Sequence, residues 1–160
     1  MINLTLQRNT IADDIDMLVR RVSNPGNAQK RSIGDAIRQQ FQENFTRQSS
    51  GSGNWAPLAR STVLDRIRRG YAGNRPILVR SGRLRGSYVE SGGADHHSTV
   101  RQLGGYTIFE EGSNSSIGLF HERGTSRMPQ RSISVLDDGQ EASIANVIDF
   151  MLLQIEQNIR

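Results

Sequence analysis

The sequence contains no cysteine, which excludes both a disulfide framework and a thiolate metal site. Aromatic residues make up only 6% of the chain and hydrophobic residues 35%, a low share for a globular domain. The 160 residues nevertheless have the length of one compact domain. We therefore expect a single domain, residues 1–160, with a modest core, long polar connections and added stability from a partner.

Long hydrophobic runs are also missing. The opening stretch "MINLTLQRNT" lacks the apolar segment of a signal peptide, and no stretch approaches the length of a membrane span. This pattern predicts a soluble protein that is made in a cytoplasm and has no membrane partner.

Lysine is nearly absent, since Lys30 is the only lysine among the 20 basic residues. Arginine presents a planar fork of donors that suits carboxylates and phosphates, whereas lysine is a flexible point charge. Such a bias fits protein interfaces as well as nucleic acid. The net charge of +4 is modest and by itself argues little for DNA binding.

The common catalytic and phosphate-binding motifs are absent: there is no GxxxxGK[ST], GxGxxG, HExxH or GxSxG. His96 and His97 are adjacent, so on a strand they point to opposite faces and cannot chelate one ion, and the same holds for Glu110–Glu111. A metal-dependent hydrolase would need the fold to bring His121 and Glu122 to the other histidines. We expect no cofactor and no enzymatic activity.

Apolar spacing predicts helices in the first third of the chain. An N-terminal helix within residues 1–26 starts at a capping-box variant at Thr10. A second helix within residues 27–48 carries an apolar stripe with a spacing of four: Ile33, Ile37, Phe41 and Phe45. Residues 49–60 have the composition of a flexible loop, in which Trp55 is expected to be a packing anchor. Ser61 or Thr62 could cap a short helix that runs through Arg69.

Residues 77–123 consist of short β-prone pieces separated by glycines: "SYVES", "STVRQL", "YTIFEE" and "IGLFHE". Gly104–Gly105 suits a two-residue hairpin turn, and the last piece could equally be a helical turn. A long amphipathic helix over residues 137–160 closes the chain. The expected fold class is α+β, with N-terminal helices, a small antiparallel sheet with long loops, and a C-terminal amphipathic helix.

Charge is segregated along the chain. The segment Arg60–Arg85 holds eight arginines and one acid, Asp65, whereas the segment from Asp137 to Glu156 holds five acids and no base. The arginines could be a solvated face and the acids a favourable helix N-terminus. Complementary patches on neighbouring copies would instead generate a closed ring. A third interpretation places nucleic acid on the arginines, with Tyr71 stacking on a base.

Three elements occur in a fixed order: "NWAPLARSTVLDRIRRG", "PILVRSGRLRGSYVE" and "GLFHERGTSRMPQRSISVLDDGQEASI". In this order they resemble the phage virion morphogenesis family, the tail-completion proteins of Mu-like and related tailed phages. The matching residues are Trp55, Pro57, Leu58 and Thr62; Leu78, Ser81, Gly82, Leu84 and Ser87; and His121, Gly124, Thr125, Pro129, Arg131 and Asp138. The family usually has a second proline and an aromatic residue after the arginine, where this chain has Ser132 and Ile133.

The resemblance implies a structural role without catalysis. Such proteins form rings, commonly sixfold, at the head-proximal end of the tail or in the neck, where they finish the tail and allow head joining. The implied partners are further copies of the chain and other tail and neck proteins, with non-specific contact to DNA that passes through the ring. The implied location is the virion, after assembly in the host cytoplasm.

The segment "HERGTSRMPQR" is interpreted as a structural joint. Gly124 lets the chain turn and Pro129 keeps it extended, while His121 is expected to form a hydrogen bond within the turn and Glu122 to pair with an arginine. The predicted interface with a second copy or another partner comprises Arg66, Arg68, Arg69, Arg80, Arg83, Arg85, Asp137, Asp138 and Glu141. The alternative function is a nucleic-acid-binding module that uses arginines of the segment Arg60–Arg85, namely Arg66, Arg68, Arg69, Arg75, Arg80, Arg83 and Arg85.

Overall fold

A computed structural model of the chain describes residues 25–103 and 106–157. The helix predicted to start at Thr10 and the turn at residues 104–105 lie outside these ranges. The described helices are α2 (Asn27–Arg47), α3 (Arg60–Arg68), α4 (Arg83–Val89), α5 (Ser116–Arg123) and α6 (Asp138–Gln157). The described strands are β1 (Ser49–Ser50), β2 (Gly53–Asn54), β3 (His96–Leu103) and β4 (Tyr106–Ser113). These elements confirm the α+β class.

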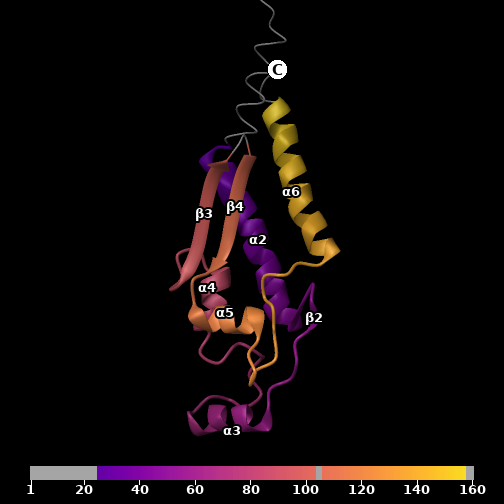
Figure 1. Ribbon diagram of the computed structural model, residues 1–160. Coiled ribbons are helices and arrows are strands. Elements are labelled where there is room, and N and C mark those ends of the chain that lie inside the picture. Colours follow the sequence, from indigo (N-terminus) through magenta and orange to yellow (C-terminus); the bar gives the residue numbers. More distant parts are fainter. Residues whose placement is uncertain (1–24, 104–105, 158–160) are drawn as a thin grey trace, which may run out of the picture.

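Helix α2 runs through the middle of the molecule and agrees with the helix predicted within residues 27–48 (Figure 1). Its apolar stripe faces the core, where Ile33, Phe41 and Phe45 are buried. The helix ends at Gln48, which has a φ of 54° and donates its backbone N–H to the carbonyl of Asn44. This left-handed residue satisfies one of the carbonyls that a helix end leaves free.

Strands β3 and β4 form an antiparallel hairpin in which His96 pairs with Ser113 and Leu103 with Tyr106. The last pair leaves two residues for the connection, as the prediction of a two-residue turn requires. The strand pieces predicted as "STVRQL" and "YTIFEE" are therefore confirmed.

The predicted strand "SYVES" is wrong, because Ser87 to Val89 belong to α4. Leu84 and Tyr88 are four residues apart and both pack on the core, which is helical spacing. The hydroxyl of Ser87 also donates to the carbonyl of Leu84 at 2.7 Å. "IGLFHE" likewise forms a helix, α5, so the region 77–123 combines one described hairpin with two short helices. The predicted side-chain cap of α3 is also wrong, since its N-cap is Ala59.

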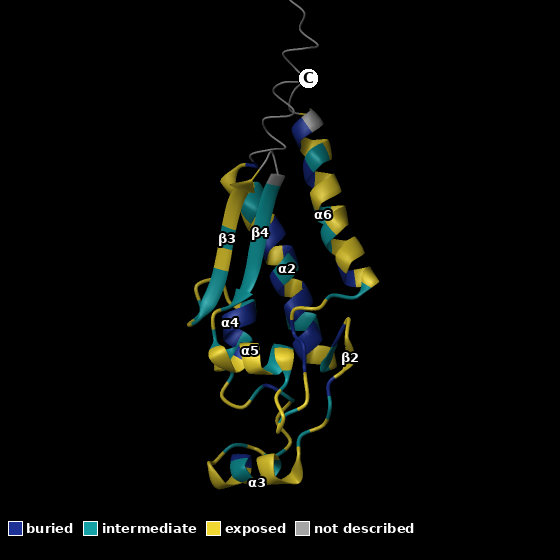
Figure 2. Cartoon of the chain, in the orientation of Figure 1, coloured by how far each residue is buried: buried dark blue, intermediate teal, exposed yellow. Residues whose placement is uncertain are grey.

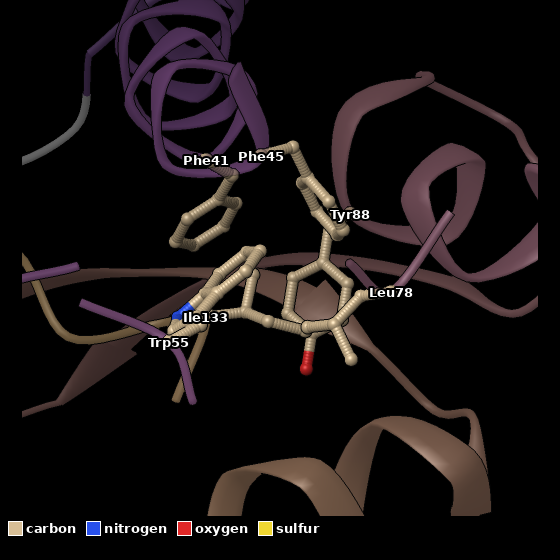
Figure 3. Packing of buried hydrophobic residues seen from close by; sticks show 6 residues of the cluster. All are labelled: Phe41, Phe45, Trp55, Leu78, Tyr88 and Ile133. Carbon is tan, nitrogen blue, oxygen red and sulfur yellow. The ribbon is translucent and has the colours of Figure 1, made fainter. Parts of the chain in front are cut away.

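The core is a small aromatic cluster between α2, α4 and the loop that precedes α6 (Figure 3). Phe45 meets Trp55 edge-on at 5.6 Å between ring centroids, and Phe41 meets Tyr88 in the same way at 5.5 Å. The indole N–H of Trp55 donates to the carbonyl of Ser132 at 2.7 Å. Trp55 is thus the packing anchor that the sequence predicted, although its segment was expected to be a flexible loop and contains the short pair β1–β2.

Helix α6 lies alongside α2 (Figure 1). It starts with a reciprocal cap: the backbone N–H of Gln140 donates to Asp137 Oδ1 at 2.9 Å, and that of Asp137 donates to Gln140 Oε1 at 3.1 Å. Met151 and Ile155 are buried, whereas much of the rest of the helix is exposed (Figure 2). Of the helices in residues 25–103 and 106–157, none is long and apolar enough to cross a membrane.

Candidate functional site

A pocket of about 1110 Å³ lies where three segments that are far apart in the sequence meet. The segments are the start of α3, the turn that leads into α4, and α5 with the loop after it. Most of the motif residues that carry the family resemblance line this pocket: Pro57, Leu58, Thr62, Leu78, Ser81, Gly82, Leu84, His121, Pro129 and Arg131. Trp55 instead lies in the core beside it.

Arg66 lines the pocket and is only 4% exposed, which is unusual for an arginine. Its Nη1 donates to the backbone carbonyls of Arg75 at 2.9 Å and Pro76 at 3.2 Å, which ties α3 to the loop that follows it. Its Nε is buried and has no hydrogen-bond partner among the described residues. Burial lowers the pKa of Arg66, and the nearby charges of Arg80 and Arg75 lower it further. The sequence offered no signal that this one arginine of the segment would be buried.

Arg131 lines the same pocket and is 5% exposed. Its Nε donates to the carbonyl of Ala56 at 2.7 Å and its Nη2 to that of Pro57 at 3.0 Å. Burial lowers the pKa of Arg131, and the charge of Arg66 adds to this effect. Two buried guanidinium groups therefore lie close enough to repel each other, and both are held by neutral carbonyl oxygens.

His121 also lines the pocket, close enough to Arg131 for the charge of the guanidinium to act on the imidazole. Its Nδ1 is buried and has no hydrogen-bond partner among the described residues, so the predicted hydrogen bond of His121 within this segment is not made by Nδ1. The bond that holds this joint comes from the backbone, where the N–H of Arg131 donates to the carbonyl of His121 at 2.8 Å. Burial lowers the pKa of His121, Arg131 lowers it further, and Glu122 opposes them.

Glu122 pairs with no arginine among the described residues, contrary to the prediction. Its Oε1 accepts from the hydroxyl of Tyr88 at 3.1 Å and from the backbone N–H groups of Ile133 and Ser134, each at 3.0 Å. Its Oε2 accepts from the hydroxyl of Ser132. Burial and the charge of Glu122 raise the pKa of Tyr88. The carboxylate thus connects α5, α4 and the loop before α6.

The geometry of "HERGTSRMPQR" agrees with a structural joint. Gly124 has a φ of 69°, in the left-handed region that favours glycine, and a Cβ there would lie 2.9 Å from the backbone nitrogen of Gln130. Thr125 and Met128 exchange backbone hydrogen bonds of 2.8 and 3.2 Å, which closes the turn. Pro129 follows this turn and lines the pocket.

Several residues of the predicted charged interface have partners within the chain. Arg69 pairs with Asp65, Arg83 with Asp95, and Asp137 with Arg47, at 2.9, 2.8 and 3.0 Å. Arg85 donates to the side chain of Gln42. Arg68, Arg80, Asp138 and Glu141 are exposed and form no ion pair with the described residues.

The three histidines do not form a metal site in the part of the chain that the structure describes. His96 and His97 point to opposite sides of β3, as expected: His96 Nε2 lies 3.4 Å from Glu111, and His97 Nε2 lies 3.8 Å from Glu110. Glu111 also pairs with Arg38 at 2.9 Å. Glu110 and Glu111 are neighbours on β4, but they contact different charged or titratable side chains.

Comparison with known proteins adds no relative: no protein-family model, curated protein or solved structure matches the chain.

Proposed function

We propose that this protein is a structural ring subunit at the tail–head junction of a tailed phage, where it finishes the tail and enables head joining. One observation carries the proposal: motif residues from three separate segments line a single pocket. Chance matches in three segments would have no reason to meet at one site. The motif order and its spatial convergence therefore support one another.

The charge distribution is the second support. Exposed arginines such as Arg68 and Arg80 belong to the segment around α3, whereas the exposed acids Asp138 and Glu141 begin α6. Two oppositely charged surfaces on one chain favour contact between different faces of neighbouring copies, which generates rings when the rotation closes.

The proposal is tested with purified virions and the purified full chain. We expect the protein to be detected in virions by mass spectrometry and located at the neck or the upper end of the tail by labelled antibody. Light scattering should show a ring-sized particle, alone or with cognate tail tubes. A chain that stays monomeric with tail tubes and is absent from virions would refute the proposal.

A nucleic-acid-binding module is the second candidate, because Arg75 and Arg80 lie over the ring of Tyr71 at 5.7 and 5.9 Å. An aromatic ring flanked by arginines can stack on a base while the cations contact phosphates. Such binding weakens steeply as salt rises, because counterions are released on association. Absence of binding to duplex and single strands at low salt would remove this candidate.

A further inference from the structure

We propose that the pocket between α3, α4 and α5 receives carboxylate side chains from a second copy of this chain, presented by an acidic stripe on α6. The inference rests on the proposed function, since it names the contact that would join neighbouring ring subunits.

Among the described residues that line the pocket, arginines outnumber carboxylates. Five arginines line it (Arg66, Arg80, Arg83, Arg127 and Arg131), and the one carboxylate among the lining residues, Asp95, is paired with Arg83. Buried charges in proteins are normally paired, because desolvation of an unpaired ion is costly.

The two buried guanidinium groups have donors left over. Arg66 and Arg131 are held only by carbonyl oxygens, and among the described residues no partner is recorded for Arg66 Nη2 or Arg131 Nη1. A carboxylate is the natural complement of a guanidinium, since two parallel N–H···O bonds can form between them. A carboxylate at this position would also relieve the repulsion between the two arginines.

The same chain carries matching acceptors, the exposed carboxylates of α6. Asp138, Glu141, Ala145 and Asp149 are spaced by three or four residues, which places them along one face of α6, and all four are exposed. None of the three acids forms an ion pair with the described residues. We call this set the acidic stripe.

Apolar groups on both surfaces add to the match. The exposed side chains of Ile148 and Leu153 flank the acidic stripe on α6. Leu58, Ile117 and Met128 line the pocket beside the arginines. A pocket of about 1110 Å³ has room for several side chains of a helix, far more than one small inorganic anion fills. A protein segment that carries both carboxylates and apolar side chains is therefore the better occupant.

The two surfaces lie in different regions of the molecule. Helix α3 is at one end, at the bottom of Figure 1, whereas α6 extends along α2 toward the other end. Contact between the pocket of one copy and the stripe of the next is therefore head-to-tail, which produces a ring if it closes and a filament if it does not.

The absence of cysteine allows a direct test by cross-linking. Ser81→Cys places a thiol among the pocket-lining residues, and Ala145→Cys places one in the middle of the acidic stripe without removing an acid. The two full-length variants are mixed at low salt and oxidised. We expect a covalent dimer of one copy of each variant, at a yield several-fold above that of either variant alone and falling as salt rises.

Gln39→Cys is the matched control, because Gln39 is also exposed but lies on α2, outside both surfaces. A yield for Ser81→Cys with Ala145→Cys that is no higher than with Gln39→Cys would overturn the proposal.

The role of the carboxylates is tested by adding Asp138→Asn, Glu141→Gln and Asp149→Asn to the Ala145→Cys variant. These positions are exposed, so the fold is retained, and circular dichroism checks this. We expect the cross-linked fraction to fall several-fold, and to fall likewise when Arg66→Gln or, if that variant does not fold, Arg127→Gln is placed in the Ser81→Cys partner. An unchanged yield with the neutralised stripe would exclude carboxylate recognition.

Failure of this inference is distinguishable from failure of the proposed function. A protein found in virions as a ring but without the pocket–stripe cross-link keeps the function and loses the inference. If the protein cross-links as expected but is absent from virions, the proposed contact is supported and the proposed phage function is refuted.

Discussion

The carboxylate of Glu122 accepts a hydrogen bond of 3.0 Å from the backbone N–H of Ile133, a residue with no exposed surface. The two residues are eleven positions apart, on either side of the turn that contains Gly124. This bond fixes the loop before α6 against α5, and with it the position of Arg131 at the pocket.

Replacement of Glu122 with alanine should therefore destabilise the fold strongly. The change leaves the hydroxyl of Tyr88, two backbone N–H groups and the hydroxyl of Ser132 without their acceptor. We expect the free energy of unfolding to fall by roughly 3 kcal/mol, since several partly buried donors lose one charged acceptor. Urea denaturation measures it. Glu43→Ala removes a carboxylate of α2 that forms no hydrogen bond with the described residues, and it should change stability by less than about 0.5 kcal/mol. Equal effects of the two variants would contradict this role of Glu122.

Asn44 holds α6 to α2. It has no exposed surface, its Nδ2 donates to the carbonyl of Ile133 at 2.9 Å, and its Oδ1 accepts from Gln140 Nε2 at 2.9 Å. Asn44→Ala removes the donor to the carbonyl of Ile133 and one of the two acceptors of Gln140 Nε2, so we expect a loss of free energy of unfolding of roughly 2–4 kcal/mol. Hydrogen exchange should show that amide protection in α6 decreases most. Asn54→Ala, at an exposed position, is the control, and a similar loss there would argue against the proposed role.

Gly124→Ala should cost more stability than Gly70→Ala. Both glycines have positive φ, 69° and 80°, so both variants pay for a strained backbone. Only at Gly124 would the new Cβ also meet backbone atoms, those of Gln130. We expect a loss of about 1 kcal/mol at Gly70 and at least 1 kcal/mol more at Gly124 in thermal unfolding. Equal losses of stability in the two variants would show that the turn at Gly124 accommodates the new methyl group without further destabilisation.

His121 should make the fold less stable in weak acid. Its pKa in the folded protein is lowered from the ordinary value of 6.5, by burial first and by Arg131 second. Below pH 6.5 the unfolded chain therefore binds a proton that the folded chain does not, so stability rises with pH in this window and is lost as pH falls.

The check is the free energy of unfolding of wild type and His121→Gln between pH 7.5 and pH 5, a range set on either side of the ordinary pKa. We expect a smaller decline on acidification in the variant, because glutamine binds no proton. Parallel curves for the two proteins would mean that His121 does not contribute to the pH dependence.

Local patterns in the sequence were enough for several elements. The spacing of Ile33, Phe41 and Phe45 predicted α2, and the β-prone pieces on either side of the glycine pair predicted the hairpin of β3 and β4. Helix α2 and the hairpin both depend on residues that are close together in the chain, so the spacing of residue types along the sequence is enough to predict them. Trp55 was identified as an anchor because a lone tryptophan beside a proline turn is more often packed in a core than exposed to a ligand, and it is buried in the structure.

The tertiary structure alone decided which polar residues matter. Nothing near Arg66 in the sequence distinguishes it from Arg68 or Arg69, yet of these three arginines only Arg66 is buried. The partners of Glu122 lie on α4 and on the loop before α6, so its role depends on contacts across the fold. The order of residues in the sequence determined that arginines and acids are segregated along the chain. The burial of two arginines without a carboxylate arises only when distant segments meet, because burial depends on the whole fold and not on local sequence.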